Sequence, residues 1–306
     1  MNIIFMGTPD FAVISLDALV QSGRHTIVGV VTAPDKPAGR GQKLSESAVK
    51  KYALQKGLPI FQPTKLKDPS FLEQLKSLNA DLQVVVAFRM LPEVVWAMPP
   101  KGTINLHASL LPQYRGAAPI NWAIINGERV SGVSTFLLKQ EIDTGDILFS
   151  EQVGIPTTYT AGDLHNELMR VGAQLLVKTV QAIENNNYIP TPQSATLSID
   201  ELKHAPKIFK EDCLIDWNQP VQVVYNHIRG LSPHPTAFSY FQDKTLKLFH
   251  VDIDPALPQI KPGQFDSDGK TFLKFACLDG LISVKELQLE GKKRMFIEEF
   301  LRGIRL

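Results

Sequence analysis

Two short stretches of this chain contain the side chains that acyl transfer requires. Asn105 and His107 are separated by one residue within the apolar run 103–107. Alternate residues of a β-strand point to the same face, so we expect the amide and the imidazole to lie side by side. Downstream, Asp143-Thr-Gly145 has the composition of a tight turn that could bring a carboxylate to this imidazole and orient it.

An amide, an imidazole and a carboxylate can together move an acyl group onto an amine. Asn105 could donate to the oxygen that becomes negatively charged when the acyl carbon is attacked, while His107 and Asp143 manage the protons. No serine or cysteine nucleophile is needed when the attacking amine is itself the substrate. Each motif alone is weak, since a lone histidine beside a strand is more often structural. Their order along the chain, with Ser109-Leu-Leu-Pro112 and Tyr114-Arg-Gly-Ala-Ala-Pro119 between them, favours a catalytic site.

The length and charge of the chain indicate two domains without a strongly basic surface. Its 306 residues exceed one ordinary core. The 32 Lys and Arg residues nearly balance the 31 Asp and Glu residues, which excludes a basic nucleic-acid-binding coat but not a local patch. No apolar run approaches the roughly 20 residues of a membrane helix. The N-terminus lacks the pattern of a signal peptide, so we expect a cytoplasmic protein that does not bind membranes.

The cysteines and histidines do not indicate a disulfide or a metal. Cys213 and Cys277 lie far apart without a C-x-x-C motif, which is typical of a reducing compartment. We expect both to be buried apolar side chains. The seven histidines lack metal-ligand spacing, so we expect no metal site.

The first half of the chain alternates strand and helix patterns. Short apolar strands are expected at residues 2–6, 27–31, 84–87 and 103–107. After the first, Thr8 is expected to be the N-cap of a helix that has Pro9 at its first position and ends at Gly23. Strands that alternate with helices form parallel sheets, whose ligands bind at the carboxyl ends of the strands. Phe88 and His107 both fall at such ends.

Strands and a long helix are expected up to about residue 184, and the pattern becomes all-β beyond Asp212. Strands at 132–138 and 147–153 flank the Asp-Thr-Gly turn, and Thr160-Ala-Gly-Asp163 resembles a capping box that opens a long helix ending near Glu184. Beyond Asp212, short alternating strands favour a small antiparallel barrel: residues 238–240, 246–251, 272–276 and 281–286.

These patterns predict an α/β protein with two domains. Residues 1–189 form a Rossmann-like, mostly parallel sheet with the candidate catalytic residues. A linker with little apolar pattern covers 190–207. Residues 208–306 form a smaller, OB-like β-barrel.

Two loops on the expected active face narrow the class of enzyme. The first turn, Gly7-Thr-Pro-Asp-Phe11, lacks the second and third glycines of G-x-G-x-x-G, which disfavours a nicotinamide-dependent oxidoreductase. Residues 33–43 are rich in Pro, Gly and cations. Such a loop is usually a solvated surface loop, yet this one follows the carboxyl end of a strand and is well placed to hold a large anionic substrate.

Together these motifs resemble the active site of formyltransferases that use 10-formyltetrahydrofolate. Within that superfamily the resemblance extends over nearly the whole chain to the bacterial methionyl-tRNA formyltransferases. It rests on the Asn-x-His and Asp-Thr-Gly motifs and on five further segments in the family's order: Ile4–Phe11, Pro34–Lys43, Tyr114–Ile120, Ile228–Ala237 and Gly291–Lys293.

The resemblance implies an activity and a set of site residues. The activity is transfer of a formyl group from 10-formyltetrahydrofolate, a co-substrate, to the α-amine of methionyl initiator tRNA, without a metal. Asn105, His107 and Asp143 would be the catalytic residues. Side chains after two strands would line the folate site: Phe88, Met90, Ser109, Leu110, Leu111 and Pro112. The chain departs from the family's pattern at 88–90, where no glycine follows the aromatic residue.

The resemblance also implies where tRNA binds. Arg40 and Lys43 of the 34–43 loop would meet the acceptor arm, and Lys207 and Lys210 of a basic linker stretch would lie close to it. The C-terminal domain is nearly neutral, so its contribution would come from a local cluster: Lys292, Lys293, Arg294, Arg302 and Arg305. We expect a monomer.

Three other interpretations stay open at the level of sequence. The same chemistry could act on a small amine, such as a nucleotide-linked sugar or phosphoribosyl glycinamide, although the basic loop and the C-terminal barrel favour tRNA. A non-catalytic RNA-binding protein is disfavoured by the intact Asn, His and Asp residues. A nucleotide-dependent oxidoreductase is disfavoured by the missing glycines.

Overall fold

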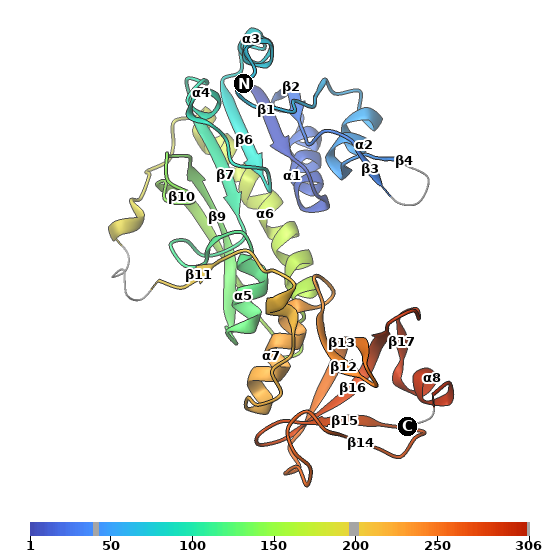
Figure 1. The fold of residues 1–306 in the computed structure, drawn as a ribbon. Helices are drawn as coiled ribbons and strands as arrows, with labels where there is room; N and C mark the ends of the chain where they lie inside the picture. Colours follow the sequence, from blue (N-terminus) through green and yellow to red (C-terminus); the bar gives the residue numbers. More distant parts are fainter. Residues whose placement is uncertain (39–42, 196–201, 305–306) are drawn as a thin grey trace. The chain divides into compact units, whose positions relative to one another are not determined.

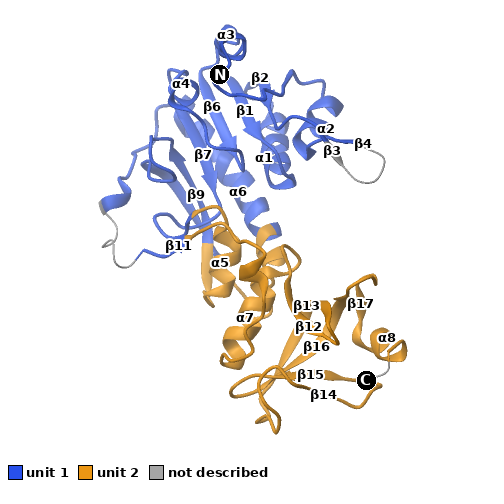
Figure 2. Cartoon of the chain, in the orientation of Figure 1, with its two compact units in different colours: residues 1–115, 132–153, 166–204 blue, residues 116–131, 154–165, 205–306 orange. Residues whose placement is uncertain are grey.

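The computed structural model describes residues 1–38, 43–195 and 202–304, which fold into two compact units (Figure 1; Figure 2). Unit 1 comprises residues 1–115, 132–153 and 166–204, and unit 2 comprises residues 116–131, 154–165 and 205–306. The last boundary lies within the stretch expected to be a linker. Two earlier segments, 116–131 and 154–165, pack with the C-terminal residues, which the sequence pattern did not indicate.

Unit 1 is built on a seven-stranded sheet with the order β10-β9-β7-β6-β1-β2-β5 (Figure 1). Its strands are β1 (Asn2–Gly7), β2 (Thr26–Val31), β5 (Ile60–Phe61), β6 (Leu82–Val86), β7 (Thr103–His107), β9 (Val130–Leu137) and β10 (Ile147–Gly154). The strands from β5 to β7 are parallel, whereas β9 is antiparallel to β7. The predicted mostly parallel sheet is therefore confirmed.

Helices cover this sheet, and a small hairpin extends from it. The helices are α1 (Asp10–Gln21), α2 (Ala48–Gln55), α3 (Pro69–Ser77), α4 (Glu93–Trp96) and most of α6 (Ala161–Glu184). The hairpin consists of β3 (Lys36–Ala38) and β4 (Lys43–Ser45). Helix α6 lies close against the sheet, because a Cβ added at Gly172 would be 3.0 Å from the Leu106 side chain of β7.

The start of α1 differs from the sequence-based prediction. Pro9, not Thr8, occupies the N-cap position, no side chain caps the helix, and the helix begins at Asp10. The prediction of Thr8 as N-cap was wrong because Pro9 has an extended backbone (φ −82°, ψ 177°), which delays the first helical turn by one residue. The Asp10 carboxylate lies in that turn, where it interacts favourably with the helix dipole.

Unit 2 is an antiparallel sheet with the order β12-β13-β16-β15-β14, and β17 pairs with β16 (Figure 1). The strands are β12 (Ala237–Phe241), β13 (Lys244–Asp254), β14 (Phe265–Ser267), β15 (Leu273–Ala276), β16 (Leu281–Leu289) and β17 (Met295–Phe296). The register shifts within the β13–β16 pair near His250, where the strands bend. The predicted antiparallel β-domain is confirmed as a curled half-barrel.

Helices close the core of unit 2. They are α5 (Pro119–Ile125), α7 (Val221–Leu231) and α8 (Ile297–Arg302). Helix α7 was not expected from the sequence. Its buried Val224, Ile228 and Leu231 face a core that also holds Cys213 and Cys277. Both cysteines are buried, as predicted. No helix within the described ranges is long and apolar enough to cross a membrane.

Short elements lie outside the two main sheets. They are β8 (Arg115–Gly116), η1 (Gln193–Ala195), β11 (His204–Ala205) and η3 (Glu211–Cys213). The predicted capping box at the start of α6 is confirmed: the Thr160 hydroxyl accepts from the Asp163 N–H, and the Asp163 carboxylate accepts from the Thr160 N–H.

Candidate active site

His107 and Asp143 lie together in unit 1. His107 is the last residue of β7, and its Nδ1 is 3.8 Å from Oδ2 of Asp143. The side chains are 8% and 12% exposed, so the pair is largely shielded from water. The predicted approach of the carboxylate to the imidazole is confirmed.

The other ring nitrogen of His107 is also next to an oxygen. Nε2 lies 2.9 Å from the backbone carbonyl of Tyr114, an atom that can only accept, so Nε2 is the donor. An imidazolium carries a proton on each nitrogen and can serve both the carbonyl and the carboxylate. A neutral ring with its proton on Nε2 has no donor for Asp143.

Asn105 lies two residues before His107 on the same strand and therefore on the same face. Its Oδ1 is buried and has no hydrogen-bond partner among the residues that the structure describes. A buried polar atom left unpaired costs about 1–3 kcal/mol, and such atoms often belong to functional sites. The strand itself is fixed, because Asn105 is paired in the sheet with both Val85 and Phe136.

Backbone geometry in the Asp-Thr-Gly turn explains its composition. Asp143 has a left-handed backbone, with φ of 55°. A Cβ added at Gly145 would lie only 1.6 Å from the carbonyl oxygen of Leu137. Only glycine allows the turn to approach β9 this closely, and this approach holds Asp143 beside His107.

The segment after β7 is folded back by its own hydrogen bonds. The Ser109 hydroxyl donates to the carbonyl of Gln113 at 2.6 Å, and the Ser134 hydroxyl donates to the carbonyl of Ser109 at 2.8 Å. In turn, the Leu111 N–H donates to the Ser134 oxygen at 3.1 Å. Ser109, Leu111 and Pro112 are buried, whereas Leu110 is partly exposed. The Ser109 hydroxyl therefore shapes this loop.

The segment after β6 contains the other two expected folate residues. Phe88 is partly buried and packs against the core of unit 1, whereas Met90 is 70% exposed. Between them, Arg89 lies over the Phe88 ring and donates to the carbonyls of Pro63 and Thr64. These hydrogen bonds of Arg89 could not be predicted from the sequence, because the two carbonyls are distant in the chain and every residue type has a backbone carbonyl.

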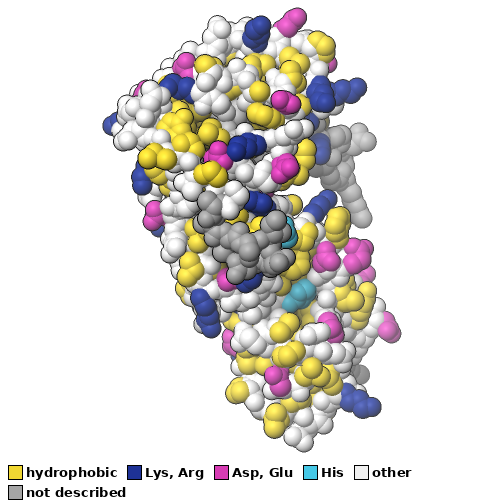
Figure 3. All heavy atoms as spheres, turned by 90° about the vertical axis from the view of Figure 1, so that its left-hand side faces the viewer, with side chains coloured by type: hydrophobic (Ala, Val, Ile, Leu, Met, Phe, Trp, Pro, Cys, Tyr) yellow, Lys and Arg dark blue, Asp and Glu magenta, His cyan; other side chains and the backbone are white. Residues whose placement is uncertain are grey.

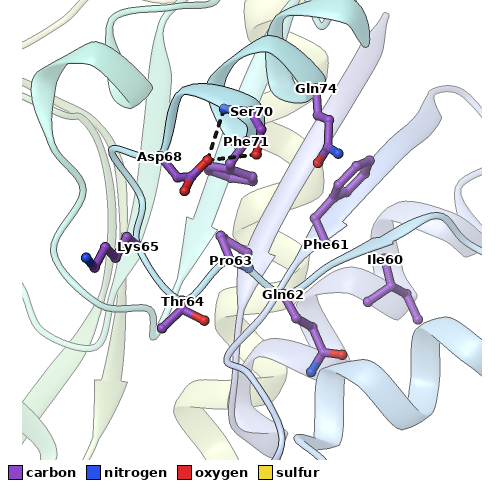
Figure 4. A pocket seen from close by; sticks show the side chains of 10 residues that line it. All are labelled: Ile60, Phe61, Gln62, Pro63, Thr64, Lys65, Asp68, Ser70, Phe71 and Gln74. Carbon is purple, nitrogen blue, oxygen red and sulfur yellow. Dashed lines mark hydrogen bonds between the residues drawn. The ribbon is translucent and has the colours of Figure 1, made fainter.

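A pocket of about 540 Å³ adjoins the carbonyls that Arg89 binds (Figure 4). It is lined by residues 60–65 and by the first turns of α3, where the Asp68 carboxylate caps the helix through the Ser70 N–H at 3.0 Å. Asn105, His107 and Asp143 do not line it. Figure 4 shows Phe61, Phe71 and Gln74 along one part of its wall.

The expected tRNA-binding residues fall in different parts of the chain. Arg40 lies outside the described residues. Lys43 begins β4, which pairs with β3. In unit 2, Lys207 and Lys210 are exposed, and the Lys207 ammonium lies 5.2 Å from the centroid of the Phe209 ring.

The base of the 34–43 loop is anchored in unit 1. Asp35 accepts from the Lys50 ammonium and, at 2.8 Å, from the Gln62 amide, which also donates to the Ala33 carbonyl. The hydrogen bond from Lys50 lowers the pKa of the Asp35 carboxyl. The chain therefore leaves β2 in a fixed direction.

The predicted basic cluster of the C-terminal domain is partly neutralised. Arg294 is paired with Glu286, and the Lys293 ammonium lies 3.6 Å from a Glu299 oxygen. Arg305 lies outside the described residues. On the face drawn in Figure 3, basic and acidic side chains are interspersed. This mixture of charges favours local contacts with an anionic polymer.

Two supports of the site were not predicted from the sequence. The Tyr114 carbonyl holds His107, and the Gln193 amide donates to the carbonyls of Asp143 and Gly145. Both are long-range or backbone contacts, for which the sequence has no local signal. In the part of the chain that the structure covers, no three His, Cys, Asp or Glu side chains are arranged to hold a metal.

Family models match both halves of the chain. The model described as formyl transferase matches residues 1–180, and the model described as formyl transferase, C-terminal domain, matches residues 207–305. Full-length relatives named methionyl-tRNA formyltransferase include that of Bacteroides fragilis, which is 52% identical over 100% of this chain and 96% of its own length. That of Flavobacterium johnsoniae is 50% identical over 99% of this chain and 96% of its own.

Solved structures share the fold at low sequence identity. An N-formyltransferase from Helicobacter canadensis, solved with folinic acid and dTDP-3-aminofucose, has a TM-score of 0.69 at 19% identity. The match covers 92% of this chain and 98% of that one. HypX from Aquifex aeolicus, in complex with tetrahydrofolic acid, has a TM-score of 0.66 at 20% identity, over 99% of this chain and 48% of that one.

Proposed function

This chain belongs to the methionyl-tRNA formyltransferase family, and we propose that its reaction takes place at Asn105, His107 and Asp143. The reaction moves the formyl group of 10-formyltetrahydrofolate to the free amino group of methionyl initiator tRNA. The observation that supports this site most strongly is that an amide, an imidazole and a carboxylate come from one strand and one turn of the same unit. An amide with an unpaired buried oxygen shares a strand with an imidazole, whose Nδ1 lies 3.8 Å from a carboxylate.

The first step is attack by the amine. The unprotonated α-amine of the methionyl group attacks the formyl carbon, and negative charge develops on the formyl oxygen. The Asn105 amide donates to that oxygen, and the positive charge of the His107 imidazolium stabilises it. One good donor of this kind is worth about 3–4 kcal/mol. Because an α-amine has a pKa of about 8, a useful fraction is neutral at physiological pH and no strong base is needed.

Asp143 orients His107 and takes part in moving the proton. Its carboxylate faces Nδ1 beyond direct hydrogen-bond length, so a water molecule can stand between them and carry a proton. The proton lost by the attacking amine then moves toward the folate nitrogen that leaves. This assignment gives Asp143 a role in proton transfer and orientation, and gives Asn105 a role in charge stabilisation.

The segments after β6 and β7 fit a folate co-substrate. They lie at the carboxyl ends of adjacent parallel strands, where ligands of such sheets bind. The unpaired Asn105 oxygen indicates a polar ligand there, and Leu110, Phe88 and Met90 offer partly or largely exposed apolar surface. We assign the folate contacts to Phe88, Met90 and the segment Ser109–Pro112, with Ser109 acting through the shape of the loop.

For tRNA, the proposal assigns phosphate contacts to Arg40, Lys43, Lys207 and Lys210. Residues 1–189 would carry the chemistry, residues 190–207 would link the domains, and residues 208–306 would help hold the nucleic acid. The enzyme would act as a monomer in the cytoplasm, where initiator tRNA is used.

The test is a transfer assay with matched acceptors. Purified protein is incubated with 10-formyltetrahydrofolate and methionyl initiator tRNA, N-acetylmethionyl initiator tRNA or a nucleotide-linked amino sugar. We expect formylmethionine only from the first acceptor, because the second has no free amine and the third offers no acceptor arm. Faster formylation of the amino sugar than of methionyl-tRNA would contradict the proposed acceptor while leaving formyl transfer intact.

A further inference from the structure

Gln193 makes four hydrogen bonds beneath the catalytic turn. Its Nε2 donates to the carbonyl of Asp143 at 2.8 Å and to that of Gly145 at 2.7 Å. Its Oε1 accepts from Arg115, from Nε at 2.9 Å and from Nη2 at 2.6 Å. The residue is 4% exposed, so these bonds form in a shielded environment. Both amide protons and both lone pairs are used, which fixes the orientation of the side chain.

The backbone of Lys203 holds the residue whose carbonyl binds His107. The backbone N–H of Lys203 donates to Oε1 of Gln113 at 2.8 Å, and the Lys203 carbonyl accepts from the Tyr114 N–H at 2.6 Å. The carbonyl of Tyr114 is the acceptor for His107 Nε2. Lys203 therefore holds the backbone of Tyr114, whose carbonyl orients the imidazole.

A backbone pair adds to the contact at the turn. Thr191 and Ile147 exchange both of their N–H···O hydrogen bonds, at 2.8 and 2.9 Å. Ile147 begins β10, directly after the turn that carries Asp143. Gln193 thus holds the turn at Asp143 and Gly145, and Thr191 holds Ile147, which follows the turn.

We propose that Gln193 and Lys203, in the segment after α6, are positioning residues that hold Asp143 and His107 at their working distance. Gln193 fixes the carboxylate through the turn, and the Lys203 backbone fixes the imidazole through Tyr114. The inference rests on the proposed function only in taking Asp143 and His107 as catalytic. Neither positioning residue touches a reacting atom.

The backbone of Asp143 shows why such support is needed. Its φ of 55° lies in the left-handed region, which is unfavourable for a residue with a side chain. Such a conformation persists when surrounding contacts over-determine it. Gln193 supplies two contacts, to the carbonyls of Asp143 and Gly145. Without them, the turn can relax and the carboxylate moves away from His107.

The test compares Gln193→Ala with Gln152→Ala in the full-length protein. Gln152 is an exposed glutamine on β10 and is a matched control in the same unit. We expect Gln193→Ala to lower kcat for formyl transfer about 10- to 100-fold, because a displacement of about 1 Å at a catalytic group can cost this much. The KM values for both substrates should change less than about threefold, and Gln152→Ala should match the wild type.

A double-mutant cycle separates positioning from a general structural effect. If Gln193 acts through Asp143, Gln193→Ala should lower kcat less than about threefold in an Asp143→Ala background. A full second loss of kcat in that background would overturn the proposal, as would a kcat for Gln193→Ala equal to that of Gln152→Ala. Should Gln193→Ala fail to fold, Arg115→Met replaces it in the cycle, because it removes only the donors to Oε1 of Gln193.

A spectroscopic measurement on the His107 ring tests the positioning role without relying on the assigned activity. The ring resonances of His107, identified by their loss in His107→Ala, should shift in Gln193→Ala and not in Gln152→Ala. Unchanged His107 resonances in Gln193→Ala would overturn the positioning role. Wild-type protein that fails to formylate methionyl-tRNA would instead contradict the proposed function, while this measurement would still test the contact.

Discussion

Replacing Gly145 with alanine should displace Asp143 and slow formyl transfer. The new Cβ would lie 1.6 Å from the Leu137 carbonyl oxygen, whereas Cβ atoms do not approach heavy atoms closer than 3.0 Å, so the turn must move by about 1.4 Å. Leu137 cannot yield easily, since β9 pairs with Ile104 of β7 at this position. A shift of this size at a catalytic group corresponds to a loss of about 100-fold in kcat. Overpacking of a fixed backbone also lowers the free energy of unfolding by about 1–3 kcal/mol.

The assay is single-turnover formylation of methionyl initiator tRNA, with denaturant unfolding measured in parallel. Gly154→Ala is the matched control, because Gly154 ends β10 and no heavy atom lies within 4 Å of a Cβ added there. We expect Gly154→Ala to keep the wild-type rate. A folded Gly145→Ala protein with an unchanged rate would refute the reasoning that the position of Asp143 controls the reaction.

Three further predictions concern tRNA, helix capping and pH. Arg40→Ala should raise KM for tRNA, while folate affinity stays unchanged. It should also reduce the slope of log affinity against log salt concentration by about one unit. An unaltered slope in a salt titration would exclude a phosphate contact by Arg40. Thr160→Ala should lower the free energy of unfolding by about 1 kcal/mol, because it removes the acceptor for the Asp163 N–H. Denaturant titration measures this loss, and an unchanged free energy would show that the capping box contributes nothing. Burial lowers the pKa of His227 from 6.5, so the unfolded chain binds a proton that the folded chain excludes, and stability should fall as pH decreases below about 6.5. His227→Gln should weaken this pH dependence, and an identical dependence in thermal unfolding from pH 7.5 to 5 would assign it to other groups.

The central strands could be anticipated because their patterns are local. Short apolar runs such as Asn2–Gly7 and Leu82–Val86 are buried on both faces, as parallel strands between helices must be. The helix α7 was missed although Val221, Val224, Ile228 and Leu231 recur at helical spacing. The helical periodicity is short, the surrounding sequence has the pattern of β-strands, and prolines stand on either side. These features favoured strands over a helix.

The candidate site was predicted where one strand and one turn specify it. Asn105 and His107 share a face of β7 because the strand period is two, and the composition of the Asp-Thr-Gly turn indicated a tight approach. The supports of the site could not be predicted. Gln193 contacts a turn 48–50 residues away, and Tyr114 acts through its backbone carbonyl, which every residue type has.

The most direct test of the central claim is the single-turnover rate of formyl transfer for Asn105→Ala and His107→Ala beside the wild type, with folate affinity measured on the same proteins. We predict that each variant folds, binds folate with unchanged affinity and transfers the formyl group at least about 100-fold more slowly, because each removes a group that stabilises the developing negative charge. Near-normal rates in either variant, at unchanged folate affinity, would contradict the assignment of the active site.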